Sequence, residues 1–212
     1  MKTADSPPPE TFGLRRNTRA RLDEILKEMI ERPEDQDELG EVINQEFAEA
    51  RAVMVLDMSG FSKTTQRRGI VCFLLMIHQL KLLAMPAVQK AGGIVVKAEA
   101  DNLYCLFEDV DHAVKAAQAI MERLETVNPL LPEDRRLHAA IGIGFGRILN
   151  VDEEDLFGDE VNLASKLGED LAQARQILLT SAANERAATH GIGTKEAQAS
   201  ISGLSLSYFE VA

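Results

Sequence analysis

Cysteine is scarce in this 212-residue sequence, and basic residues are outnumbered by acidic ones. Cys72 and Cys105 are too few for a disulfide framework and stand in apolar surroundings, so we expect reduced core thiols. The 23 Lys and Arg residues face 34 Asp and Glu, which leaves a net charge of −11. Nucleic-acid-binding proteins need a basic surface, so nucleic acid is not expected as a partner. An acidic protein that handles an anionic substrate must gather cations or metals locally, which favours a metal site.

Long apolar runs are also missing. The most apolar run, residues 70–77, is far shorter than the roughly 20 residues that cross a bilayer, and Lys81 follows soon after. The N-terminus is polar and contains Pro7-Pro8-Pro9, without the apolar segment of a signal peptide. We therefore expect a soluble, cytoplasmic protein that has no membrane partner.

Composition and apolar spacing divide the chain into three parts. Residues 1–13 are polar and rich in proline, so we expect a disordered tail. Residues 14–50 carry apolar side chains at helical spacing on either side of Pro33, which predicts two helices that pack on the domain or on a partner chain. Residues 51–212 form the domain itself, and an apolar content of 45% is ordinary for a globular core.

The predicted strands and helices of this domain follow the order of a ferredoxin-like α+β fold. The longest helix is apolar on almost every side between Ile70 and Val88, which indicates burial against its own sheet and against a second subunit. In chain order, the core elements are a strand at 52–56, a helix at 64–91, strands at 94–98 and 103–107, a helix that Asp109 or Asp111 can cap, and a strand at 137–143, a β-α-β-β-α-β arrangement. After these come a helix at 160–171, a strand at 177–180, a helix at 181–188 and a strand or hairpin at 201–211.

Two isolated acids stand just after buried strands. The apolar run that starts at Val53 ends in Asp57, which a tight Ser59-Gly60 turn follows. A second apolar strand is followed by Asp101. Taken singly, each acid could be a strand-end cap or a turn residue. Taken together, they are the carboxylates that a metal-dependent phosphoryl-transfer site needs.

Three segments resemble, in the same order, the motifs of the class III nucleotidyl cyclase family. Residues 57–62 are similar to its first metal motif, and residues 92–101 to its second, which ends in the second metal Asp. Residues 155–158 and 161–166 are similar to its third motif. The resemblance covers about residues 50–211 and implies the family's ferredoxin-like catalytic core, here with an N-terminal helical extension.

Members of this family convert a nucleoside triphosphate to a 3′,5′-cyclic nucleotide and pyrophosphate. The resemblance implies that Asp57 and Asp101 hold two divalent ions, Mg²⁺ or Mn²⁺, and that the Met58 carbonyl completes a metal site. One ion activates the ribose 3′-hydroxyl, and the other neutralises the triphosphate. The turn formed by Ser59, Gly60, Phe61 and Ser62 would offer backbone N–H groups to the β- and γ-phosphates.

Base selection in the family falls to two positions, which are Lys97 and Asp155 in this sequence. A lysine donates to the acceptor ring nitrogen of adenine, and an aspartate accepts from its exocyclic amine. Guanine presents the reverse pattern, so the pair favours adenine over guanine. Cytosine presents the same acceptor and amine as adenine, so the pair does not distinguish these two bases. A simpler explanation of Lys97 is a solvated lysine on an edge strand.

The third motif also implies catalytic roles for Asn162 and Lys166. Asn162 would orient the ribose, and Lys166, one helical turn later, would stabilise the transition state. Familiar members have Arg at the second position, and Lys lacks its planar fork. Ala100 stands where the family commonly has Gly, and residues 203–210 lack the lysine that often binds the triphosphate.

The resemblance further implies a head-to-tail homodimer with shared active sites. In such a dimer the metal-binding carboxylates of one chain face the base-selecting pair of the other chain, together with Asn162 and Lys166 of that other chain. The leading hypothesis is therefore an adenylate cyclase that converts ATP to cyclic AMP. The alternatives are a pyrimidine cyclase of the antiphage signalling type, which uses CTP or UTP, and a cyclase-like module that binds nucleotide without turnover. The Gly-rich run 142–146 lies in a strand, so we interpret it as a site of close backbone approach.

Overall fold

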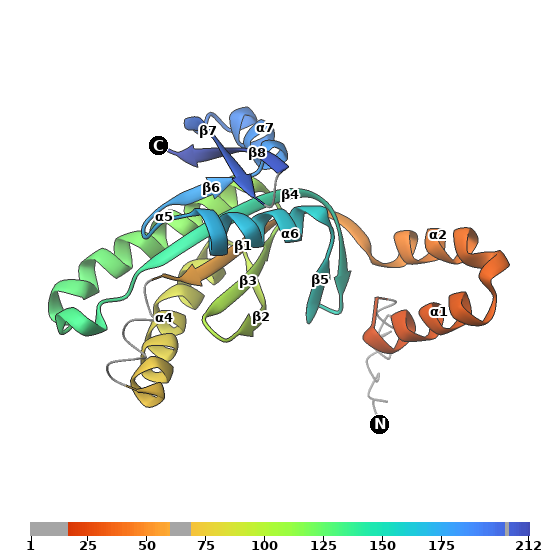
Figure 1. Ribbon diagram of the computed structural model, residues 1–212, viewed down its shortest axis with the longest axis horizontal. Coiled ribbons are helices and arrows are strands. Elements are labelled where there is room, and N and C mark those ends of the chain that lie inside the picture. Colours follow the sequence, from red (N-terminus) through yellow and green to blue (C-terminus); the bar gives the residue numbers. More distant parts are fainter. Residues whose placement is uncertain (1–16, 60–68, 202–203) are drawn as a thin grey trace, which may run out of the picture.

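The computed structural model describes residues 17–59, 69–201 and 204–212, and its centre is one mixed sheet of eight strands (Figure 1). The order of the strands across the sheet is β2-β3-β1-β4-β6-β8-β7, and β5 pairs with β4 alone. The predicted disordered tail, residues 1–13, lies outside the described residues.

The ferredoxin-like core predicted from the sequence is confirmed. Its chain order is β1-α4-β2-β3-α5-β4, and its four strands lie in the sheet order β2-β3-β1-β4, all antiparallel. The core elements are β1 (Ala48–Met58), α4 (Ile70–Lys90), β2 (Ile94–Glu99), β3 (Asn102–Phe107), α5 (Val110–Val127) and β4 (Ala139–Val151). The later elements are β5 (Asp155–Phe157), α6 (Asp159–Lys166), β6 (Ile177–Leu179), α7 (Ser181–Thr189), β7 (Thr194–Ile201) and β8 (Leu204–Val211).

The side chains of β1 alternate between two apolar layers. Met54, Leu56 and Met58 enter the large core formed with α4 and α5. Val53 and Val55 enter a smaller core on the opposite face, which α6 covers. Asp57 continues the second series, so the strand delivers its carboxylate on the α6 side of the sheet.

The Gly-rich run of β4 lets α6 lie directly on the sheet, as the sequence predicted. A Cβ atom at Gly142 would lie 2.7 Å from the Gly168 nitrogen and closer still to the Ala164 carbonyl oxygen. A Cβ atom at Gly144 would clash with Glu160 in the same way. These glycines are therefore needed for helix-to-sheet contact, and the run is not a phosphate-binding loop.

Replacing Gly142 by Ala should destabilise the protein by about 1–3 kcal/mol, because the new methyl group overpacks the contact with α6. Urea unfolding would measure the loss. Gly40 is the matched control, because it lies within α2 (Gln36–Phe47) and nothing stands within 4 Å of its missing Cβ. Gly40→Ala should instead raise the stability by roughly 0.5–1 kcal/mol. Equal stability of Gly142→Ala and the natural protein would contradict this packing.

Helix α4 is longer than the apolar run singled out in the sequence. By length and composition alone its 21 residues could cross a membrane, but a core helix meets the same criteria. One face of α4 packs into the large core through Phe73, Met76, Ile77, Leu80, Ala84, Ala87 and Val88. The other face is exposed in the single chain and carries Ile70, Val71, Leu74, Leu75, Leu82 and Met85. The predicted start at Thr64 lies outside the described residues.

Two helices, α1 (Arg19–Glu31) and α2, precede the sheet and lie beyond β5 (Figure 1). Leu22, Ile25, Ile43 and Phe47 bury their apolar faces against Val151 of β4. Helix α2 runs directly into β1 at Ala48, so the strand begins four residues before the predicted position. The reason is that β4 continues well past its predicted end at Ile143, and its Ile148 and Leu149 pair with the extra β1 residues.

Candidate active site

Strand pairing brings the two predicted metal-binding carboxylates together. Asp57 is the last residue but one of β1, and Asp101 lies in the two-residue turn between β2 and β3. Because Leu103 of β3 pairs with Leu56 of β1, this turn sits beside the end of β1. Ala100, the other turn residue, has a φ of 48°, a left-handed conformation that glycine adopts more easily.

A third carboxylate, Glu169, faces the same place and was not anticipated from the sequence. It lies in a π-helical turn (Leu167–Leu171) that follows α6. Gly168 allows this turn to touch β1, because a Cβ there would lie 2.9 Å from the Val55 carbonyl oxygen. Glu169 Oε1 accepts hydrogen bonds from Asn102 Nδ2 at 3.0 Å and from the Tyr104 hydroxyl at 3.2 Å.

The three carboxylates disfavour one another's charge. Burial, then the charges of Asp101 and Glu169, raise the pKa of Asp57 to about 7. Burial also raises the pKa of Asp101 and that of Glu169. In the part of the chain that the structure describes, no Lys or Arg pairs with Asp57 or Asp101. Oxygen ligands with uncompensated negative charge suit Mg²⁺ or Mn²⁺, so these residues fit the metal ions that the sequence implied.

The metal-free protein should lose stability as the pH rises from about 4 to 7. In this window the folded state keeps the proton of Asp57, whose pKa is about 7, while the unfolded state, with a pKa of 3.8, has released it. Unfolding temperatures measured in a chelator across this range would show the decline. Added Mn²⁺ should raise the unfolding temperature more above pH 7 than near pH 5, because it competes with the proton. An equal rise at both pH values would contradict this explanation.

A second acidic cluster is already neutralised by basic side chains. Asp109, Asp111 and His190 lie close enough to hold a metal ion. Arg186 forms an ion pair with Asp109, and Lys115 lies 2.7 Å from Asp111. The Arg186 hydrogen bond lowers the pKa of Asp109 to about 2. This cluster therefore fits a divalent ion less well than the carboxylates at Asp57 and Asp101 do.

The two predicted base-selecting residues are in direct contact. Lys97 Nζ donates to Asp155 Oδ1 at 3.0 Å and lies 3.4 Å from Glu99. Its ammonium group stands 4.7 Å from the centroid of the Tyr104 ring. Burial opposes ionisation of Asp155, but the hydrogen bonds from Lys97 and Arg19 outweigh it and lower the pKa of its carboxyl. The pair is therefore charged and presents a donor beside an acceptor.

Strand β5, which was not predicted from the sequence, positions Asp155. Val151 of β4 pairs with Asp155, and the Leu156 N–H donates to Asp155 Oδ1 at 2.9 Å. A further cation, Arg19 of α1, donates from Nη2 to Asp155 Oδ2 at 2.7 Å. No motif pointed to Arg19, because it precedes the segment that resembles the cyclases.

The remaining predicted residues lie in two places. Asn162 and Lys166 are four residues apart on α6, and both are exposed in the single chain. The Met58 side chain is buried, while Ser59 donates its N–H to the His138 carbonyl oxygen at 3.0 Å. That N–H is therefore not free to bind a phosphate, but the Ser59 Oγ is buried and has no hydrogen-bond partner among the described residues. Gly60, Phe61 and Ser62 lie outside the described residues.

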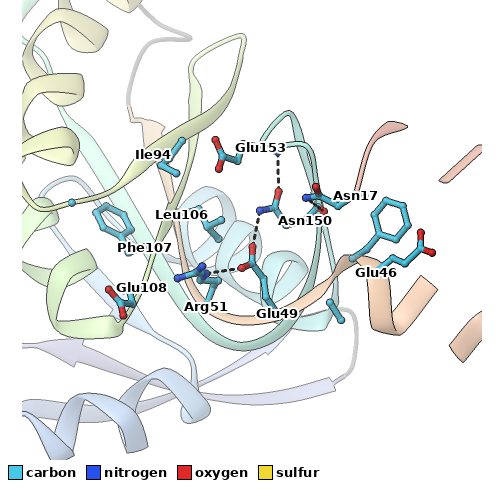
Figure 2. Close-up of a pocket in the computed structure, with 13 residues that line it drawn as sticks. Asn17, Glu46, Glu49, Arg51, Ile94, Leu106, Phe107, Glu108, Asn150 and Glu153 are labelled. Atoms are coloured by element: carbon cyan, nitrogen blue, oxygen red, sulfur yellow. Dashed lines mark hydrogen bonds and ion pairs between the residues drawn. The ribbon is translucent and has the colours of Figure 1, made fainter. Parts of the chain in front are cut away.

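A cavity of about 500 Å³ lies near the start of β1 and contains none of the predicted site residues (Figure 2). Arg51 and Asn150 both bind Glu49 in its wall, at 2.9 and 2.6 Å. Asn17, just before α1, donates to the Asn150 carbonyl oxygen at 3.2 Å. The cavity therefore marks where the N-terminal segment is attached to β1 and β4.

Comparison with known proteins agrees with these observations. No protein-family model matches the chain. The chain is 31% identical over 116 residues to "Putative adenylate cyclase 3" of Rhizobium meliloti (strain 1021), and 26% identical over 132 residues to "Serine/threonine-protein kinase pkn2" of Myxococcus xanthus. These matches cover 55% and 62% of this chain, but the chain spans only 20% and 16% of the two relatives.

Solved structures match over more of the chain. The catalytic core of a rhodopsin-guanylyl cyclase with converted specificity, in complex with ATPalphaS, superimposes with a TM-score of 0.67 at 19% identity and covers 78% of this chain and 98% of its own. The adenylate/guanylate cyclase/hydrolase from Silicibacter pomeroyi gives a TM-score of 0.66 at 22% identity, with 78% and 97% covered. The chain has the class III cyclase fold. The resemblance inferred from the motifs is therefore confirmed.

Proposed function

We propose that this cyclase-fold protein is an adenylate cyclase that converts ATP to 3′,5′-cyclic AMP and pyrophosphate. The contact between Lys97 and Asp155 is the observation that carries this proposal. The lysine can donate to the adenine ring nitrogen N1 while the aspartate accepts from the N6 amine. Guanine would place a donor against Lys97 and an acceptor against Asp155, so GTP should be a poor substrate. The broader class, a nucleotidyl cyclase, is also favoured by the similarity to proteins with cyclase names.

The carboxylates at the end of β1 supply the other half of the chemistry. Asp57 and Asp101, with Glu169 beside them, would hold Mg²⁺ or Mn²⁺, which lower the pKa of the ribose 3′-hydroxyl and neutralise the triphosphate. The buried Ser59 hydroxyl, which has no partner within the described part of the chain, is a candidate donor to a phosphate oxygen. Lys166 would place positive charge near the reacting phosphorus, and Asn162 would hold the ribose.

A homodimer is part of the proposal. Asn162 and Lys166 are exposed in the single chain, where a nucleotide held by a second subunit's carboxylates could contact them. The exposed apolar face of α4 would be covered in such an assembly. We propose a head-to-tail arrangement in which the metal-binding carboxylates of one chain face the base-selecting pair and α6 of the other. A cytoplasmic location is also part of this proposal, as is the division of the chain into N-terminal helices, residues 14–50, and a catalytic domain, residues 51–212.

Product analysis tests the substrate directly. The purified protein is incubated with Mn²⁺ and each of ATP, GTP, CTP and UTP, and the cyclic nucleotides are quantified. Cyclic AMP should be the main product. A clear preference for CTP or UTP would favour the pyrimidine cyclase, because cytosine presents the same acceptor and amine to Lys97 and Asp155. ATP binding without any product would instead indicate a cyclase-like module without turnover.

A further inference from the structure

Arg19 contacts the base-selecting Asp155 although 136 positions separate them in the sequence. It is the first residue of α1, and its Nη2 donates to Asp155 Oδ2 at 2.7 Å. Its guanidinium also stands over the Phe157 ring, 5.6 Å from the centroid. Asp155 and Phe157 are two residues apart on β5, so they project from the same face of this strand. Arg19 therefore lies across the face of β5 that carries the base-selecting carboxylate.

The backbone around Arg19 is held in place by other contacts. Thr18 caps α1, and Asn17 donates its Nδ2 to the Asn150 carbonyl oxygen at 3.2 Å (Figure 2). Leu22 and Ile25 are buried against β4. The Arg19 side chain itself is 44% exposed, and exposed ion pairs contribute little to stability. The first turn of α1 thus presents Arg19 to Asp155 without depending on their ion pair for its position.

The hydrogen bonds of Asp155 leave one acceptor position open. A carboxylate offers about four lone-pair positions on its two oxygens. Oδ1 accepts from Lys97 Nζ and from the Leu156 N–H, while Oδ2 accepts from Arg19 alone among the residues that the structure describes. The position that remains for a base amine is therefore on Oδ2, next to the guanidinium. Arg19 has five N–H donors, of which this contact uses one, so it can also donate to the base.

Lys97, Asp155 and Arg19 together present a donor, an acceptor and a donor. Adenine presents the complementary order, because its N6 amine stands between two acceptors, N1 and N7. The amine of cytosine has an acceptor on one side only, and a carbon-bound hydrogen on the other. We propose that Arg19 is a third base-reading residue, which donates to N7 of adenine and thereby favours ATP over CTP. This inference rests on the proposed cyclase function and goes beyond the pair that motif comparison assigned.

Substrates that lack N7 test the proposal. The ratio of kcat/KM for ATP to that for 7-deaza-ATP is measured with Mn²⁺ for the natural protein and for Arg19→Ala. The natural protein should prefer ATP by about tenfold, the size of one charged hydrogen bond, and the ratio should fall to about one in Arg19→Ala. The preference for ATP over CTP should fall by a similar factor. If Arg19 had a purely structural role, its replacement would lower kcat/KM for both adenine substrates equally and leave the ratio unchanged.

Arg21→Ala is the matched control. Arg21 lies in the same helical turn but pairs with Glu46 and Glu24, not with Asp155. The Arg21→Ala variant should prefer ATP over 7-deaza-ATP by the same factor as the natural protein. A natural protein that uses the two adenine substrates equally well, or an Arg19→Ala variant that still discriminates, overturns the proposal. If ATP yields no cyclic product while CTP does, the proposed adenylate cyclase function fails, and the role of Arg19 fails with it.

Discussion

Replacing Asp57 by Asn should abolish cyclase activity and, at the same time, stabilise the metal-free protein above pH 7. The amide is nearly isosteric but cannot supply the charge that holds a divalent ion. Losing roughly 4 kcal/mol of transition-state stabilisation would lower kcat by about a thousandfold. Activity with saturating Mn²⁺ and the unfolding temperature in a chelator are the two measurements.

The gain in stability follows from the raised pKa of Asp57. In the folded protein this pKa is about 7, against an ordinary value of 3.8, so ionising Asp57 above pH 7 costs the folded state more than the unfolded state. The Asn side chain removes that cost, which includes the repulsion from Asp101 and Glu169. The difference in unfolding temperature between the variant and the natural protein should shrink toward pH 4, where Asp57 is protonated in the folded state.

Asp23→Asn serves as the control, because Asp23 is exposed on α1. This variant should leave the cyclase activity unchanged. Normal turnover by Asp57→Asn would refute the metal-binding role of this carboxylate. A variant that is less stable than the natural protein above pH 7 would show that Asp57 has a favourable partner in the folded state.

The sequence predicted the core of the fold because its signals are local. The apolar runs and the Asp109 cap each lie within one element or beside it. The β-α-β-β-α-β order then leaves few topologies. Strand β5 was missed because three residues are too few to show a period. The prediction ended the strand at Ile143 although it placed the Gly-rich run in a strand, and Gly144 and Gly146 are required in β4 by packing against Glu160.

The parts of the site that escaped prediction depend on contacts between distant segments. Lys97 and Asp155 were paired by motif, and the structure places them 3.0 Å apart. Glu169 and Arg19 belong to no motif, and they reach the site across 65 and 136 positions of sequence, through Tyr104 and Asp155. Such contacts follow from how α6 and α1 pack on the sheet. They become visible only when the tertiary structure is known.

Mixing two inactive variants should restore activity if the active site is shared between subunits. Asp57→Asn removes a metal-binding carboxylate, whereas a chain with both Asn162→Ala and Lys166→Ala loses the groups that α6 would contribute. Each homodimer is inactive. In an equal mixture about half of the dimers are heterodimers, and each has one intact site of two, so the mixture should recover about a quarter of the natural activity.

This recovery is specific to a head-to-tail arrangement. The two defects of a heterodimer fall in the same site, because one chain supplies its faulty carboxylate where the other supplies its faulty α6, and the second site receives both intact halves. If one chain built a complete site by itself, every site in the mixture would carry a defect and no activity would return. Denaturing and refolding the variants together, with each variant refolded alone as the control, ensures that the subunits exchange. Failure to recover activity despite demonstrated heterodimers would refute the shared site.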